Sequence, residues 1–149
     1  MYQSGAFNNE LINVLKNYEN IMNIVLPTLG LERKKTYSPF LPICPETGKV
    51  LEIPIIEIDT KQNEVVFDNH GKKFKTKVTD GHCKLQWKVD WAMRWSALKV
   101  DFEMYGKDLI PSAELSGKIC KTLGTSPPNG FAYESVSYTH LTLPTILLV

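Results

Sequence analysis

The stretch WKVDWAMRW at residues 87–95, followed by VDFEMYGKD at residues 100–108, decides how this chain is organised. All three tryptophans of the protein fall within the first nine of these residues, beside one acid and two bases. Such a cluster suits a cationic, amphipathic small molecule, because aromatic rings attract an ammonium group and a carboxylate neutralises it. A tryptophan-rich packing layer with solvated charges explains the same pattern, since aromatic residues also dominate cores.

The second part of this stretch has the layout of a nucleotide-binding edge. Residues 100–105 are typical of a strand, and residues 112–123 carry apolar side chains at helical spacing before Gly124, a stop signal. Ligands of open α/β sheets sit beyond the carboxyl ends of the strands. Gly106 would let a ribose approach the backbone, and Asp108 could accept hydrogen bonds from its hydroxyls or cap the helix.

The remaining pattern predicts a helix followed by a β-rich segment. Residues 8–26 show helical periodicity, with Asn8 or Asn9 as the cap and with Pro27 and Gly30 as the end. Strands are predicted at 50–58, 64–67 and 74–78, with turns at 69–71 and 79–81, and Pro54 indicates an edge or a bulge. A short helix at 90–98 and a loop at 125–130 complete the prediction. The fold class expected is α/β.

Several blocks of the sequence together resemble the class I lysyl-tRNA synthetase, in its alphaproteobacterial type. They are TYSPFLPICP at 36–45, the tryptophan block, GKD at 106–108 and LSGKIC at 115–120. The resemblance runs from about residue 2 to residue 134. It implies part of a Rossmann-type parallel sheet with a small antiparallel β insertion. The divisions expected are a helix and connection of the catalytic core (1–38), a degenerate zinc-ribbon-like insertion (39–89) and a further portion of the catalytic core (90–134).

The resemblance also implies an enzyme, a cytoplasmic lysine–tRNA ligase that activates lysine with ATP, accompanied by Mg²⁺, and transfers it to tRNA(Lys). Trp87 matches the residue that lines the lysine pocket, and Asp90 and Trp91 are its neighbours in the motif. Gly106 and Asp108 match the Gly-x-Asp that meets the ATP ribose. Many relatives have a histidine where this chain has Leu109, so a contact made by that histidine is not carried over.

The resemblance implies a central fragment that is inactive alone. The family's HIGH-type signature is expected before Tyr2 and its KMSKS-type loop after Glu134, so no catalytic residue is expected within the chain. Residues 136–145, VSYTHLTLPT, resemble the translation of a sequencing adapter, and residues 135–149 contain no Lys, Arg, Asp or Glu. We treat 135–149 as a non-native tail. The alternative is a genuine apolar strand.

The cysteines raise the question of a zinc site. Cys44-Pro-Glu-Thr-Gly48 resembles half a zinc knuckle, and His82 with Cys83 could form the other half. A structural zinc site needs four N or S ligands, and Thr47 stands where the next cysteine would be. We therefore expect no zinc. Cys120 falls in an apolar helical pattern, and three widely spaced cysteines argue against a disulfide framework.

Composition leaves the partners open. Seventeen basic and sixteen acidic residues give a net charge of +1, so no global basic field indicates a nucleic-acid partner. No apolar stretch reaches membrane-spanning length, so we expect no membrane partner. Two alternatives remain: another class I synthetase, such as one for glutamate or cysteine, or a degenerate non-catalytic binding module. The sequence does not indicate an oligomeric state.

Overall fold

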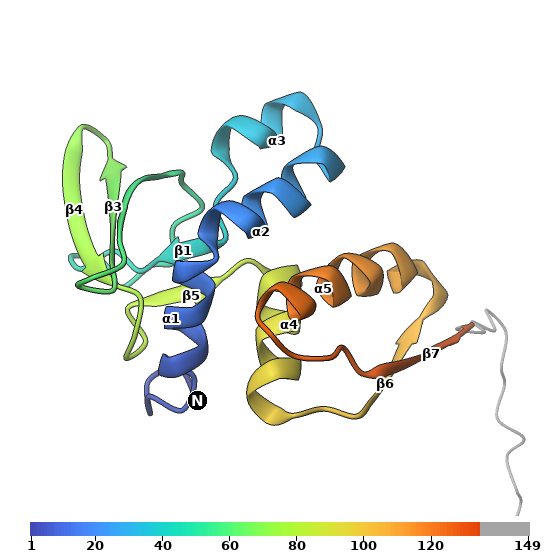
Figure 1. Cartoon of the computed structure of the whole chain (residues 1–149). Coiled ribbons are helices and arrows are strands. Elements are labelled where there is room, and N and C mark those ends of the chain that lie inside the picture. The colour runs from blue at the N-terminus through green and yellow to red at the C-terminus, as the bar shows by residue number, and fades with distance from the viewer. Residues whose placement is uncertain (135–149) are drawn as a thin grey trace, which may run out of the picture.

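The structure, a computed structural model, describes residues 1–134 of the chain (Figure 1). The predicted tail at 135–149 lies outside the described residues. The helices are α1 (Asn8–Lys16), α2 (Tyr18–Val25), α3 (Leu31–Thr36), α4 (Trp87–Leu98) and α5 (Ile110–Thr122), with short 3-10 turns η1 (Leu26–Thr28) and η2 (Lys107–Leu109). The strands are β1 (Phe40–Pro42), β2 (Ile55–Asp59), β3 (Glu64–Asn69), β4 (Lys72–Lys77), β5 (Cys83–Leu85), β6 (Phe102–Gly106) and β7 (Asn129–Tyr133).

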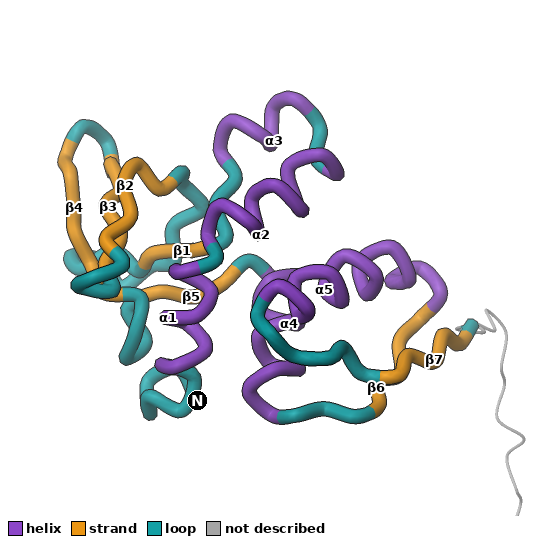
Figure 2. Tube along the Cα trace, viewed as in Figure 1, coloured by secondary structure: helices purple, strands orange, loops and turns teal. Residues whose placement is uncertain are grey.

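The strands form three small sheets, and Figure 2 shows the β2–β3–β4 and β6–β7 sheets at opposite ends of the molecule, with β1 and β5 on the side of β2–β3–β4. β2, β3 and β4 form an antiparallel sheet, and β1 pairs antiparallel with β5. β6 and β7 are parallel, and α5 is the crossover helix that a parallel pair requires. The α/β class, the antiparallel pairing between residues 40 and 85 and the parallel sheet beyond residue 100 are confirmed.

One hydrophobic core joins the helices to the small antiparallel sheets. Its largest fully buried side chains come from the N-terminal segment, α1, α2, β1, β3, α4 and α5: Phe7, Leu11, Leu15, Ile21, Phe40, Val65, Met93 and Ile119. α4 is buried on more than one face, because Val89 and Met93 enter this core while Trp95 packs toward β6. α4 therefore packs both against the hydrophobic core and against the β6–β7 sheet.

The antiparallel sheet follows the predicted pattern closely. Val65 and Phe67 alternate inward along β3, and Phe67 stacks on Phe74 of β4 with ring centroids 5.6 Å apart. The β3–β4 turn uses His70 and Gly71, both with positive φ, as the predicted turn requires. The strand predicted at 50–58 begins only at residue 55, directly after Pro54, and β2 is an edge of its sheet.

The N-terminal helix differs from its prediction in two ways. It breaks at Asn17, whose side-chain amide donates to the backbone oxygen of Asn13 and so competes with the helical ladder. The predicted cap at Asn8 or Asn9 is wrong, because Phe7 is the cap residue and makes no side-chain capping bond. Asn8 instead exchanges hydrogen bonds with Asp80, at 2.8 and 3.0 Å. The short α3 was not predicted.

Two further elements near the tryptophan stretch differ from the sequence analysis. α4 starts at Trp87, three residues before the predicted helix, with Gln86 as its cap residue. The chain beyond Pro128, predicted as a loop to residue 130, forms β7 from Asn129 onward. Gly124 ends α5 as predicted, with φ of 88°. Among residues 1–134, no helix combines the length and apolar character needed to cross a bilayer.

Candidate functional site

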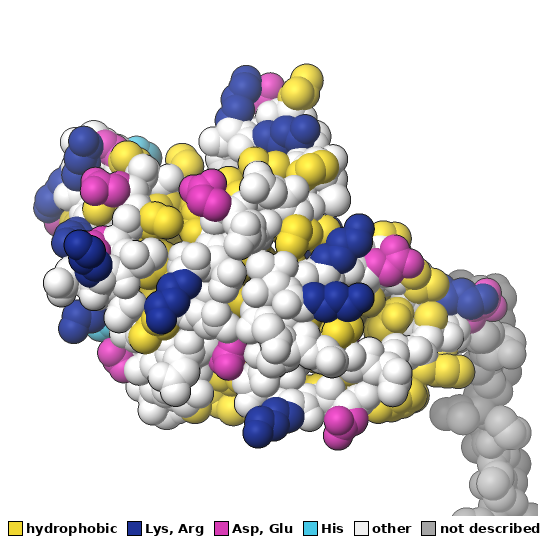
Figure 3. All heavy atoms as spheres, viewed as in Figure 1, with side chains coloured by type: hydrophobic (Ala, Val, Ile, Leu, Met, Phe, Trp, Pro, Cys, Tyr) yellow, Lys and Arg dark blue, Asp and Glu magenta, His cyan; other side chains and the backbone are white. Residues whose placement is uncertain are grey.

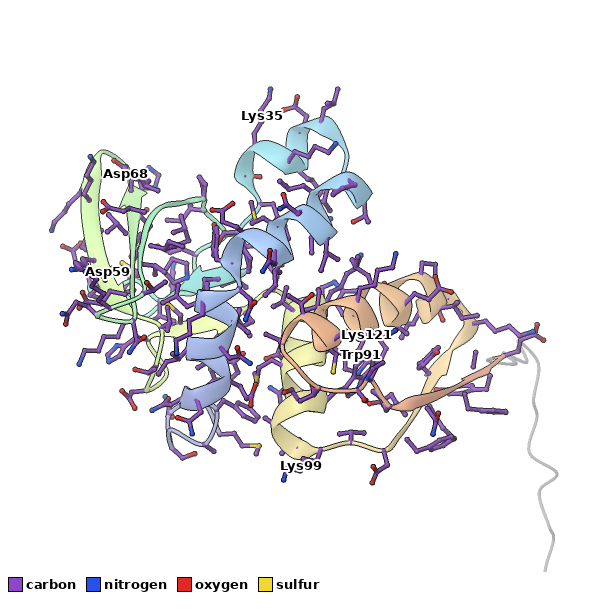
Figure 4. All side chains as sticks on the ribbon, in the orientation of Figure 1. Lys35, Asp59, Asp68, Trp91, Lys99 and Lys121 are labelled. Carbon is purple, nitrogen blue, oxygen red and sulfur yellow. The ribbon has the colours of Figure 1, made fainter. Side chains whose placement is uncertain are left out.

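The three tryptophans form a ladder along one face of α4, as their spacing of four residues dictates. Trp87 and Trp91 stack with centroids 6.0 Å apart, and Trp91 and Trp95 lie 4.8 Å apart. Glu103 of β6 accepts hydrogen bonds from the indole nitrogens of Trp95, at 2.8 Å, and Trp91, at 3.4 Å. Trp91, labelled in Figure 4, also meets the edge of Tyr105. The sheet thus fixes the indoles of Trp91 and Trp95.

The exposed end of this ladder borders an open hollow of about 310 Å³. Its lining residues are Trp87, Asp90, Trp91, Arg94 and Leu109. Trp87 is 50% exposed, whereas Trp95 is 4% exposed and serves packing. The hollow therefore offers two aromatic rings, an aliphatic side chain and a pair of opposite charges to a small molecule.

Asp90 is held on both of its oxygens. The Tyr2 hydroxyl donates to Oδ1, and Arg94 Nε donates to Oδ2 at 2.6 Å. Burial and the hydrogen bond to Asp90 raise the pKa of Tyr2 above its usual range, so Tyr2 stays a donor. The Arg94 guanidinium also lies over the Phe7 ring, 5.2 Å from its centroid. This arrangement orients Asp90 and offsets its charge.

Sequence reasoning missed part of this network. In the packing alternative for this stretch Arg94 is a solvated charge, but the structure pairs it with Asp90. The i, i+4 spacing of Asp90 and Arg94 was the available signal. Tyr2 reaches Asp90 across 88 residues of sequence, and no local pattern announces that contact.

Gly106 and Asp108 lie next to this hollow. Gly106 ends β6 and is buried, and Asp108 follows in η2 with its side chain exposed. A methyl group at position 106 would come within 2.5 Å of Asp108 Oδ1, so the carboxylate sits against the glycine. Neither η2 nor α5 receives a side-chain capping bond, which is evidence against the capping role for Asp108. The next residue, Leu109, lines the hollow.

A larger hollow, of about 360 Å³, lies against Trp95 of α4 and Tyr105 of β6. It runs between α5 and the loop before β7, and its lining includes Tyr105, Gly117, Pro127 and Lys121, the last of which is labelled in Figure 4. None of the five residues predicted to bind lysine or ATP lines it. The structure therefore gathers Trp87, Asp90 and Trp91 around one hollow, with Gly106 and Asp108 adjoining through Leu109.

The cysteines do not assemble a ligand set within the described residues. No three His, Cys, Asp or Glu side chains of residues 1–134 are grouped so that they could hold a metal ion. Hydrogen bonds, first from the Thr47 side chain, lower the pKa of the buried Cys44 thiol. Burial raises the pKa of the Cys83 thiol to about 12, which opposes the thiolate that zinc requires. The zinc-free state of the protein stays a prediction.

Comparison of the sequence with known proteins identifies a family. A model of the family described as tRNA synthetases class I (K) matches residues 1–142. The lysine–tRNA ligase of Rickettsia bellii (strain OSU 85-389) is 53% identical over 135 residues, which are 90% of this chain and 26% of that protein. The lysine–tRNA ligase of Rickettsia rickettsii (strain Sheila Smith) is 54% identical over 134 residues, with 89% and 26% covered.

The chain thus spans about a quarter of the length of the curated relatives it matches. The family match includes residues 136–142, so the foreign origin of the tail stays a prediction. It also covers the tryptophan ladder, the hollow and the Gly106–Asp108 turn together. The chain belongs to the class I (K) family of tRNA synthetases.

Proposed function

We propose that this chain is the part of a lysine–tRNA ligase that binds lysine beside the ATP ribose. The observation that carries the proposal is the hollow bordered by Trp87, Asp90, Trp91 and Leu109, with the Gly106–Asp108 turn at its margin. The family match and the ligase relatives support the assignment. The intact enzyme would be cytoplasmic and would act on lysine, ATP with Mg²⁺, and tRNA(Lys).

The hollow suits lysine by its chemistry. Trp87 and Trp91 offer stacked rings to the four-methylene stem, and an exposed indole attracts an ammonium group. Leu109 adds an aliphatic surface where the stem would lie. Asp90 adds carboxylate oxygens whose charge Arg94 offsets and whose direction the bonds to Tyr2 and Arg94 fix. Fixed groups lower the entropy lost when a ligand is ordered.

The adjoining turn suits a nucleotide. Asp108 keeps its carboxylate exposed just after the end of a parallel strand, and Gly106 leaves room for that carboxylate because it has no side chain. Hydroxyl pairs of a ribose are donors for such a carboxylate. Placing the two sites side by side would bring the lysine carboxylate to the α-phosphorus of ATP, and positioning supplies much of the rate of such a step.

The experiment is a chimera in which residues 1–134 replace the matched segment of the Rickettsia bellii ligase. We expect it to exchange pyrophosphate into ATP in the presence of lysine and to charge tRNA(Lys), whereas the isolated chain does neither. Exchange supported by glutamate or cysteine instead of lysine would favour another class I synthetase. A folded chimera without exchange would favour the non-catalytic binding module.

A further inference from the structure

Among the residues that the structure describes, those around the hollow provide no excess of negative charge. Asp90 is the acidic residue of its lining, and Arg94 Nε donates to that carboxylate at 2.6 Å. Lys88 adds a positive charge, because its ammonium nitrogen lies 5.6 Å from the centroid of the Trp87 ring. On the face of the molecule that Figure 3 shows, basic and acidic side chains are interspersed, so no broad negative field attracts a cation there. A hollow that selects a cation therefore needs a further source of negative charge.

Glu103 of β6 brings a second carboxylate to the tryptophan ladder. Its Oε2 accepts hydrogen bonds from the indole nitrogens of Trp95, at 2.8 Å, and Trp91, at 3.4 Å. Both donors are neutral groups, and the Glu103 side chain is half-buried. Within residues 1–134, no basic side chain forms an ion pair with Glu103. Its negative charge therefore has no direct counter-charge, unlike that of Asp90.

Packing of the indoles explains the hydrogen bonds of Glu103 but not its charge. The buried Trp95 indole needs an acceptor for its N–H group, as buried tryptophans usually do. A neutral acceptor, such as a glutamine side chain, would serve that purpose. A carboxylate that is partly withdrawn from water without a counter-charge costs free energy. The charge of Glu103 is therefore more than packing requires.

We propose that Glu103 is a positioning residue that acts through Trp91 and makes the hollow selective for a cationic side chain. Trp91 lines the hollow, and an ammonium group is attracted by the negative potential of an indole face. A carboxylate that accepts the indole N–H polarises the ring and makes this potential more negative. The charge of Glu103 also acts directly, across the width of one ring, in surroundings less polar than water. The inference rests on the proposed lysine site and adds the source of its preference for charge.

The test compares lysine with norleucine in the chimera with the Rickettsia bellii ligase. Norleucine has the carbon chain of lysine without the ammonium group, and Glu103→Gln keeps an acceptor oxygen while removing the charge. In pyrophosphate exchange, we expect Glu103→Gln to raise the KM for lysine by about threefold or more and to leave kcat nearly unchanged. The inhibition constant of norleucine should stay the same. Glu114→Gln, at an exposed position of α5, makes the same charge change and should alter neither constant.

A second variant covers the case in which Glu103→Gln fails to fold. Trp91→Phe keeps an aromatic ring but removes the N–H group through which Glu103 acts, so it should weaken lysine more than norleucine. An unchanged preference for lysine over norleucine in either folded variant would overturn the inference and leave the lysine site standing. Equal weakening of both ligands in Glu103→Gln would also overturn it, because Glu103 would then serve packing alone. A parent chimera without lysine-dependent exchange would overturn the proposed function and this inference together.

Discussion

The β2–β3–β4 sheet and the β6–β7 sheet are completed in opposite ways. The antiparallel sheet closes through tight turns, and its inward residues Val65 and Phe67 are fully buried within the chain. The parallel sheet needs a crossover helix, covers one face with tryptophans and leaves Met104 and Phe131 exposed on the other. Antiparallel strands find their partners locally, whereas parallel strands need neighbours from distant parts of a chain.

The largest expected effect separates the two sheets directly. Phe67→Ala removes a fully buried ring that stacks on Phe74, and it should destabilise the isolated chain by about 3–5 kcal/mol. Met104→Ala, at a position of β6 that is 60% exposed, should change stability by less than about 0.5 kcal/mol, because little of its side chain is buried. Urea unfolding of both variants measures the difference. Similar losses of unfolding free energy in the two variants would contradict the view that Phe67 is buried within the chain while Met104 is exposed.

The next effect concerns α4, which joins the two regions. Asp90→Ala leaves Tyr2 and Arg94 without their shared acceptor and should cost about 1–3 kcal/mol. Asp101→Ala, an exposed carboxylate before β6, is the matched control and should be nearly neutral. Thermal unfolding can compare the two. Equal melting temperatures would mean that the network positions a ligand without holding α4 to the N-terminal segment.

A smaller effect tests the ladder's open end in the chimera. Trp87→Ala should weaken lysine use by about 1–2 kcal/mol through lost ring contact with the side chain. Leu98→Ala, at the other end of α4 and similarly exposed at 51%, should leave lysine use unchanged. Asp108→Ala should raise the KM for ATP more than that for lysine. Pyrophosphate exchange, measured while the concentration of lysine or of ATP is varied separately, distinguishes the effect on lysine use from the effect on ATP use. If Trp87→Ala left the dependence on lysine unchanged and Asp108→Ala left the dependence on ATP unchanged, both binding assignments would be wrong. The tryptophans would then serve packing alone.

The same contrast explains what the sequence could predict. Alternation at 64–67 and 74–78 and a turn at 69–71 sufficed for β3 and β4, because their pairing is local. β7 was missed because Pro127, Pro128 and Gly130 indicate a loop, while the strand is specified by pairing with β6. The start of α4 was missed because burial on more than one face blurs its periodicity. The lysine-binding role of Trp87, Asp90 and Trp91 is predicted from their motif and stays a prediction. Tyr2 was not predicted, because it reaches Asp90 through a contact between residues far apart in the sequence.

The smallest expected effect is a pH dependence confined to the antiparallel side. The Asn8 side chain, followed by Thr79, holds the pKa of Asp80 below its ordinary value of 3.8, and the backbone of Gln62 does the same for Asp59. A lowered folded-state pKa contributes stability that is present above about pH 4 and is lost as the pH falls through the folded value. Melting temperature should therefore decline below pH 4, and Asp80→Asn should flatten that decline. Asp101→Asn, beside the parallel sheet, makes the same charge change without such donors and should leave the acid slope as it is. If both variants flattened the decline of melting temperature equally, net charge would govern the acid sensitivity, and the hydrogen bonds to Asp80 and Asp59 would not. Repulsion due to net charge does not depend on the position of the substituted carboxylate.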